Sequence, residues 1–278
     1  MDKGLAADFA ECRRLVDEGD ADRAVSLAYA PDDRRDALAA LYAFDIETGR
    51  VRAHVSQPLP GEIRLQWWRD RLADPQDEGQ GAPVAHALQD TIRRYDLPRD
   101  AFERYLDARI FDLYDDPMPG RAEFEVYAGE TASTIIMLAA MILSGRPDTV
   151  VADAAGHAGV ATLAAGLLRG EPRLRGLGQS FVPGDLLSAA GADHGGWAAG
   201  PEGLEAARLA LAAYARDHLN AVTDRLSQIS PAIRPAFLPA LANNAALRMV
   251  ERSGGRPYVE SRFAAVHRLW SYWRAMRA

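Results

Sequence analysis

The sequence is poor in cysteine and has no long apolar run. Cys12 is the single cysteine among 278 residues, which excludes a disulfide framework and a cysteine metal centre and suits a reducing cytoplasm. The longest apolar run, Ile135 to Leu143, is about half of the roughly 20 residues that a membrane-spanning helix needs. The first residues lack a basic stretch followed by an apolar one, so we expect no signal peptide. These features predict a soluble protein, or at most one peripheral to a membrane.

Basic residues are in the minority. The chain has 32 Lys and Arg against 39 Asp and Glu, which gives a formal net charge of −7 and a pI near 5.4. Proteins that bind nucleic acids neutralise phosphates with clustered basic residues. We therefore expect no nucleic-acid partner.

Several catalytic and metal-binding patterns are missing. No two of the six histidines are four residues apart, the spacing that would place two imidazoles on one helical face. A zinc site is therefore not expected. The nucleophile pattern GxSxG and the phosphate-loop pattern GxxxxGK[ST] are also missing, which argues against an esterase and against a P-loop enzyme.

Alternating runs of Val, Ile and Thr are missing as well, so the sequence predicts no strands. Apolar residues recur instead at helical spacing, as in Leu38, Leu41, Phe44, Val51 and Val55. The breaks between the predicted helices are short and hold Gly or Pro, and none is a clear domain linker. We predict one all-α domain over residues 1–278, with residues 184–203 as its longest irregular segment. Helices are expected to begin near Ala6, Asp32, Gly61, Val84, Arg99, Arg121, Asp148, Pro201, Pro231 and Glu260.

Alanine is dense in three of these helical segments, "LAAMIL", "DAAGHAGVATLAAGLL" and "LEAARLALAAYA". Small side chains let helices approach closely, or they leave room for a cavity between helices. Both interpretations stay open from the sequence.

Two local clusters could carry chemistry. Asp112, Asp115 and Asp116 form either a carboxylate cluster able to hold Mg²⁺ or the solvated end of a helix. Trp67 and Trp68 are adjacent and cannot both point into the same core. Either one of them lines a pocket or packs on an arginine, or both fill gaps between helices.

Five stretches together resemble the squalene/phytoene synthase family. They are "RRDALAALYAFDIETGRVR", "GEIRLQWWRDRL", "FDLYDDPMP", "YAGETAS" and "FVPGDLL", which occur in the family's order over roughly residues 20 to 250. The closest resemblance is to the branch whose eukaryotic members are mitochondrial assembly factors for respiratory complex I. The resemblance implies an isoprenoid synthase-like helical bundle around a deep central cavity. In the family's enzymes, two aspartate-bearing helices face each other across this cavity and bind Mg²⁺ and prenyl diphosphates.

The chain departs from the family at both aspartate motifs. The first follows "YAFCR" with a DxxxD pair, and the matching positions here are Gly49 and Ala53. The second is "NxLRDxxxD", where this sequence has Gly170 and Leu174, and we expect Pro172 to end that helix early. A diphosphate leaves only if metal ions neutralise its developing charge, so these losses argue against the family's chemistry.

Other polar residues remain near the two motifs. Glu47, Arg50 and His54 have the spacing of one helical face, which we expect to point toward the cavity. The remaining residues form either an ion-pair network in place of the metals or a metal-free site for a phosphate or a lipid head group, and both interpretations predict salt bridges. The candidate residues are Glu47, Arg50, His54, Arg64, Trp68, Arg169 and Glu171.

Three functions follow as hypotheses. The first is a non-catalytic assembly or binding factor, for a subunit of respiratory complex I in a bacterium. The second is a transferase that still condenses prenyl diphosphates, the only case in which Mg²⁺ is expected as a cofactor. The third is a non-catalytic binder of an isoprenoid or lipid in the retained cavity. We expect a cytoplasmic protein, and the C-terminal "RLWSYWRAMRA" either rests on the inner membrane or packs on the body.

Overall fold

The computed structural model describes residues 3–74, 81–145 and 148–278, and it contains only helices and connecting segments in these ranges. The all-α prediction is therefore confirmed. The α-helices are α1 Lys3–Gly19, α2 Ala21–Leu27, α3 Asp32–Gly49, α4 Val51–His54, α5 Pro58–Ala73, α6 Pro83–Tyr95, α7 Arg99–Ala108, α8 Phe111–Tyr114, α9 Arg121–Ala128, α10 Thr134–Ser144, α11 Thr149–Gly176, α12 Gly184–Ala189, α13 His194–Ala199, α14 Glu205–Arg225, α15 Leu238–Arg252 and α16 Ala264–Ala275. A π-helical turn, Gly129–Ser133, joins α9 to α10, and two 3₁₀ turns, Leu226–Gln228 and Arg234–Ala236, lie between α14 and α15.

Local sequence explains where several helices begin and end. α6 has Pro83 in its first turn, where the missing N–H costs nothing, and it ends at Asp96 with a left-handed φ of 50°. The α11 N-terminus is capped by Asp148, whose side chain accepts a hydrogen bond of 2.9 Å from the Val151 N–H. These local signals set the residues at which the helices begin and end. The tertiary contacts then set how the helices pack.

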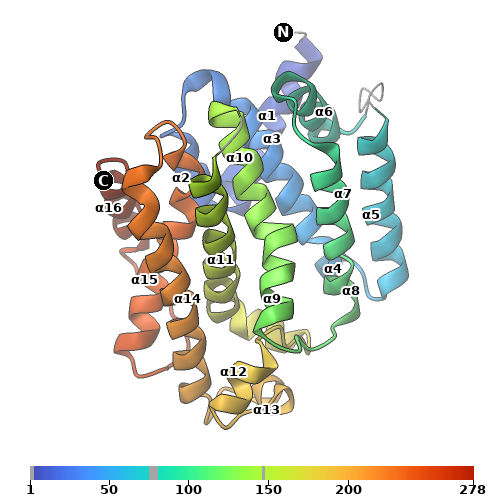
Figure 1. Cartoon of the computed structure of the whole chain (residues 1–278). Coiled ribbons are helices and arrows are strands. Elements are labelled where there is room, and N and C mark those ends of the chain that lie inside the picture. Colours follow the sequence, from blue (N-terminus) through green and yellow to red (C-terminus); the bar gives the residue numbers. More distant parts are fainter. Residues whose placement is uncertain (1–2, 75–80, 146–147) are drawn as a thin grey trace.

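The helices pack side by side around α10 and α11 (Figure 1). α11 contacts α14 and α15 on one side and α10 and α9 on the other, and α10 also contacts α3. α5 and α7 lie at one edge of the bundle, whereas α15 and α16 lie at the opposite edge (Figure 1). The irregular segment expected at 184–203 instead holds two short helices, α12 and α13.

The π-helical turn lies against α11 at very short range. A Cβ added at Gly159 of α11 would stand 2.6 Å from the backbone nitrogen of Ser133, far closer than atoms can pack. The neighbouring buried residues of α11 are mostly alanine, including Ala154, Ala155 and Ala158. Close helix packing is therefore one use of the alanine-rich segments.

The C-terminal half of α11 differs from the prediction. Pro172 was expected to end this helix, but α11 continues through it to Gly176. The next turn is held by tertiary ion pairs, since Glu171 is buried and accepts hydrogen bonds from Arg175 and from Arg208 of α14. These contacts outweigh the local penalty of one missing backbone hydrogen bond.

Two helical stretches, Arg121–Ser144 and Thr149–Gly176, have the length and apolar composition of a membrane span. In each, 56% of the most apolar window is buried inside the molecule. Their place at the centre of the bundle accounts for this composition.

Candidate functional site

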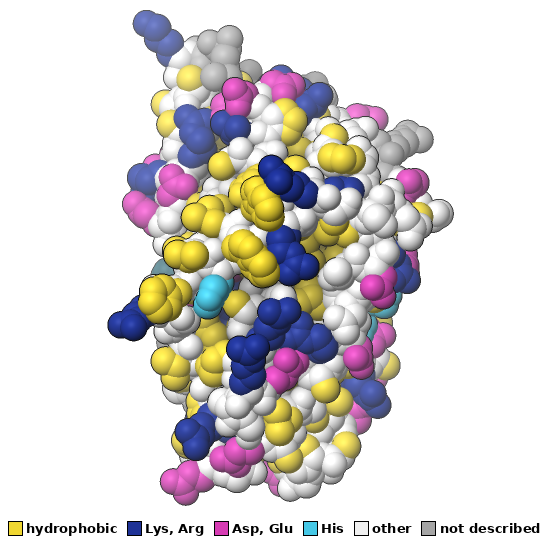
Figure 2. Space-filling view, turned by 90° about the vertical axis from the view of Figure 1, so that its left-hand side faces the viewer, with side chains coloured by type: hydrophobic (Ala, Val, Ile, Leu, Met, Phe, Trp, Pro, Cys, Tyr) yellow, Lys and Arg dark blue, Asp and Glu magenta, His cyan; other side chains and the backbone are white. Residues whose placement is uncertain are grey.

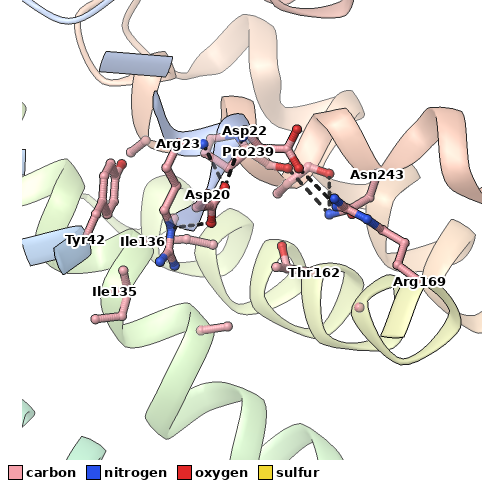
Figure 3. A pocket seen from close by; sticks show the side chains of 14 residues that line it. Asp20, Asp22, Arg23, Tyr42, Ile135, Ile136, Thr162, Arg169, Pro239 and Asn243 are labelled. Carbon is pink, nitrogen blue, oxygen red and sulfur yellow. Dashed lines mark hydrogen bonds and ion pairs between the residues drawn. The ribbon is translucent and has the colours of Figure 1, made fainter. Parts of the chain in front are cut away.

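A cavity of about 150 Å³ lies at the centre of the bundle, between α2, α3, α10, α11 and α15. Its wall is apolar at Ile135 and Ile136 and polar at Asp22, Arg169 and Asn243 (Figure 3). A cavity of about this size holds a benzene-sized molecule, and sites for larger organic ligands measure about 300–1,000 Å³. The described cavity is therefore too small for a prenyl diphosphate.

Arg169, one of the predicted residues, lies at the rim of this cavity and is ion-paired. Its Nη1 donates to Asp22 at 3.0 Å and to Asn243 at 3.1 Å, as Figure 3 shows. Burial alone lowers the pKa of Arg169, but the charge of Asp22 outweighs it and the pKa is raised. The Asp22 carboxylate also forms a salt bridge with Arg268 of α16, whose Nε lies 2.5 Å from Oδ1. Two arginines and one carboxylate thus form a closed cluster.

A second cluster centres on Asp45, which belongs to the stretch "FDIETGRVR". Arg23 of α2 approaches its carboxylate at 2.6 Å and Arg109, just after α7, at 2.8 Å, while the Tyr105 hydroxyl donates a hydrogen bond. Burial raises the pKa of Asp45, but the charges of the two arginines and the hydrogen bond from Tyr105 lower it by more. The pKa of Asp45 therefore lies below its ordinary value. Asp45 is therefore a largely buried carboxylate, 12% exposed, with two arginine partners.

The four positions of the lost motifs do not fit a metal ion. Gly49 and Ala53 are exposed, Gly170 is half-buried and Leu174 is buried, and none carries an oxygen ligand on its side chain. A Cβ at Gly49 would lie 3.5 Å from the Arg109 guanidinium, so a cation occupies the space beside this position. Within residues 3–74, 81–145 and 148–278, no three His, Cys, Asp or Glu side chains are arranged to hold a metal ion. The residues present do not fit the Mg²⁺ cluster that the family implies.

Glu47, Arg50 and His54 do not share one helix, because α3 ends at Gly49 and a separate short helix, α4, begins at Val51. Arg50 and His54 are exposed, and the His54 ring lies 2.8 Å from the Arg50 carbonyl oxygen. Glu47 is half-buried and pairs with Arg64 at 3.5 Å. Burial raises the pKa of Glu47, and the charge of Arg64 opposes this shift.

The two tryptophans divide their roles, as one of the two interpretations predicted. Trp68 is fully buried and packs edge to face on Phe44, with ring centroids 5.0 Å apart. Trp67 lies under the guanidinium of Arg64, 4.6 Å from the ring centroid. Glu47, Arg64 and both tryptophans line a second cavity of about 230 Å³ at the α5 edge, away from Arg169. The predicted candidates thus fall into separate places.

Glu171 forms the most buried ion pair. It is 1% exposed, and its two oxygens each lie 2.7 Å from nitrogens of Arg208, which is 0% exposed. Arg175 adds a third bond at 2.6 Å. Sequence reasoning found Glu171 but not Arg208, which looks like any other arginine in a helix.

Of the three aspartates of "FDLYDDPMPG", Asp116 is exposed at the end of a helix, as one interpretation predicted, whereas the other two are paired with arginines. Asp115 ends α8 with a left-handed φ of 57° and pairs with Arg52 at 2.5 Å, and this hydrogen bond lowers its pKa. Asp112 pairs with Arg109 at 3.1 Å and accepts a hydrogen bond from Tyr127. Both side chains therefore hold arginines in place.

The chain belongs to the squalene/phytoene synthase family, whose family model matches residues 16–272. It is 26% identical over 252 residues to "NADH dehydrogenase (ubiquinone) complex I, assembly factor 6" of Rattus norvegicus, which covers 90% of this chain and 75% of the rat protein. It spans little more than half the length of the bovine, human and mouse proteins of that name.

Two further comparisons involve enzymes. The chain is 27% identical over 163 residues to "Presqualene diphosphate synthase" of Rhodopseudomonas palustris, covering 58% of this chain and 57% of that protein. A solved dehydrosqualene synthase superposes with a TM-score of 0.84 at 16% identity, covering 98% of this chain and 96% of that one. The second comparison establishes the isoprenoid synthase-like fold alone.

Proposed function

We propose that this protein is a non-catalytic member of its family and acts as an assembly factor for respiratory complex I. One observation carries the proposal most: the four positions that bear aspartates in the family hold Gly49, Ala53, Gly170 and Leu174. The charges that remain nearby are engaged with each other, as in the pairs of Asp45 with Arg109 and of Glu171 with Arg208. The similarity to complex I assembly factor 6 supports complex I assembly as the process in which the protein acts.

The proposed place of action is the cytoplasm beside the inner membrane, where a peripheral protein meets membrane-bound subunits. The partner is a complex I subunit or subassembly. The negative charge of −7 and the shortage of basic clusters in most of the chain count against nucleic acid as the partner.

The test has two arms. Deleting the gene in the organism that encodes the chain should lower NADH:quinone oxidoreductase activity and the amount of assembled complex I on native gels. Succinate oxidation should stay unchanged as a control. An unchanged level of assembled complex I would contradict the assembly function.

The second arm is enzymatic. The purified protein is incubated with Mg²⁺ and radiolabelled farnesyl or geranylgeranyl diphosphate beside an active family enzyme, and we expect no apolar product. A squalene-like or phytoene-like product would favour the alternative function, a prenyl diphosphate transferase. The similarity to presqualene diphosphate synthase supports that alternative. Storage of an isoprenoid or lipid in the central cavity is disfavoured by its volume of about 150 Å³.

A further inference from the structure

One face of the molecule gathers exposed hydrophobic side chains. Of the twelve large hydrophobic residues exposed in the described part of the chain, half fall between residues 259 and 273. They are exposed by 48–72% and comprise Val259, Phe263, Val266, Leu269, Trp270 and Trp273. Figure 2 shows hydrophobic and basic side chains side by side on the face where α16 lies. We call these six residues, with the arginines of 252–278, the C-terminal face. So dense a cluster on one surface marks an interaction site.

The charge of this segment is opposite to that of the rest of the protein. Residues 252–278 contain six arginines and one acidic residue, Glu260, so they carry +5, and the remaining chain carries −12 to give the total of −7. Arg268 is paired with Asp22. Among the described residues, Arg262, Arg274 and Arg277 have no carboxylate within salt-bridge distance. The free arginines therefore provide a positive surface.

The free arginines and the exposed aromatic rings project together. Arg274 lies over the ring of Trp270 at 4.8 Å, and Arg277 over the ring of Trp273 at 4.2 Å. Tryptophan prefers the boundary between lipid head groups and acyl chains, where its ring has apolar surroundings and its N–H meets water. An arginine beside it reaches phosphate groups at the same level. Such pairs of tryptophan and arginine suit a membrane surface, where apolar acyl chains lie beneath a layer of anionic head groups.

A groove of about 560 Å³ runs beside α16, almost four times the volume of the central cavity of about 150 Å³. Met249, Tyr258 and Trp270 contribute apolar surface to it, and Arg248 and Arg252 contribute charge. This combination offers space for part of an amphiphilic molecule next to the cationic rim.

We propose that the C-terminal face docks onto the surface of a membrane that contains anionic phospholipids. α16 has 12 residues, too few for the roughly 20 that span a bilayer, so it lies along the interface. A second copy of the chain is a poorer occupant, because a two-fold dimer would bring the unpaired Arg262, Arg274 and Arg277 of one copy close to those of the other. The proposal rests on this face alone and does not depend on the assembly function.

The test uses flotation of the full-length protein with vesicles. One set contains phosphatidylcholine alone and the other phosphatidylcholine mixed with phosphatidylglycerol. We expect binding to the anionic vesicles, weaker binding to the neutral ones, and release as salt is raised. Trp270→Ser/Trp273→Ser should lower the partition coefficient at least tenfold. Arg262→Gln/Arg274→Gln should lower it about fivefold for each arginine removed and reduce its salt dependence.

The matched control is Leu59→Ser/Ile63→Ser, which removes two hydrophobic side chains of similar exposure, 65% and 63%, from α5 at the opposite edge. It should bind as the unchanged protein does. Circular dichroism melts check that every variant folds. No binding to anionic vesicles, or equal loss in the control, would overturn the proposal. Light scattering tests for a dimer. A dimer that is lost in the tryptophan variant would assign the C-terminal face to self-association and would also overturn the membrane proposal.

Discussion

The interior of the bundle and its C-terminal face use arginine in opposite ways. Inside, Arg208 and Arg109 are each paired with a carboxylate, that of Glu171 and that of Asp45. On the C-terminal face, arginines such as Arg274 and Arg277 lie over exposed tryptophans instead. Paired charges in a closed interior hold a structure together, whereas free charges beside exposed apolar groups are available to a partner.

Under the proposed function, this difference places the interacting surface on the outside of the molecule. The family resemblance implies a deep central cavity, but the cavity between α2, α3, α10, α11 and α15 measures only about 150 Å³, and its rim residues Asp22 and Arg169 bind each other. An assembly factor has no need of a substrate cavity. It needs an outer surface that contacts subunits or a membrane. This comparison requires that the paired charges of the interior serve to stabilise the fold.

The largest effect is expected from Glu171→Gln. The substitution leaves Arg208 buried without its counter-ion, and breaking a buried pair in this way costs about 3–5 kcal/mol. The free energy of unfolding is measured by chemical denaturation. The control is Glu18→Gln, which removes one partner of the exposed pair with Arg14 and should leave the unfolding midpoint unchanged.

The opposite result would remove the contrast between the two regions. If Glu171→Gln were neutral or stabilising, Glu171 would resemble a residue kept for binding at the expense of stability. The interior would then have to be considered a ligand site again.

The second prediction concerns the contact between α11 and the π-helical turn. Gly159→Ala adds a methyl group where the Ser133 backbone lies 2.6 Å away, and overpacking of this kind costs about 1–3 kcal/mol. Gly156→Ala, one turn earlier on α11, meets no atom within 4 Å and should raise stability by about 0.5–1 kcal/mol. Changes in Tm of opposite sign for the two variants would establish that α11 and the π-helical turn are rigidly packed at Gly159. Equal changes would mean that this contact adapts to a larger side chain.

Sequence patterns predicted the fold better than the site. Helical spacing at Leu38, Leu41 and Phe44 was sufficient for α3, because that signal is local. Asp45 was overlooked, because one partner, Arg109, lies 64 residues away and only the tertiary structure brings the two together. Pro172 misled for the same reason, since the contacts that carry α11 past it come from α14. Local rules do not register such contacts.

A histidine pair illustrates this limit too. His157 of α11 and His218 of α14 lie 61 residues apart in the sequence, but their Nδ1 atoms are 3.0 Å apart in the structure. Tyr214 packs edge to face on His218, and the Glu125 carboxylate lies 3.9 Å from its Nε2. The pair therefore joins two central helices through a contact that depends on protonation.

The smallest effect is expected from the pH dependence of this contact. Burial and then the neighbouring His157 lower the pKa of His218, while the charges of Glu125 and Asp217 oppose the shift. In the unfolded chain the His218 side chain has a pKa of about 6.5, so the unfolded state takes up the proton first as the pH falls. The stabilising effect is therefore complete above about pH 6.5 and is lost as the pH falls through the lower pKa of the folded state.

Thermal melts at pH 7.5 and 5.5, about one unit on either side of that value, measure this loss. We expect a modest decrease in Tm at the lower pH, smaller than the change caused by Gly159→Ala. His218→Gln should make the decrease smaller, because the group that takes up the proton is gone. His54→Gln, at an exposed position, should leave the decrease as it is. An unchanged pH dependence in His218→Gln would mean that α11 and α14 are held together by their apolar contacts alone.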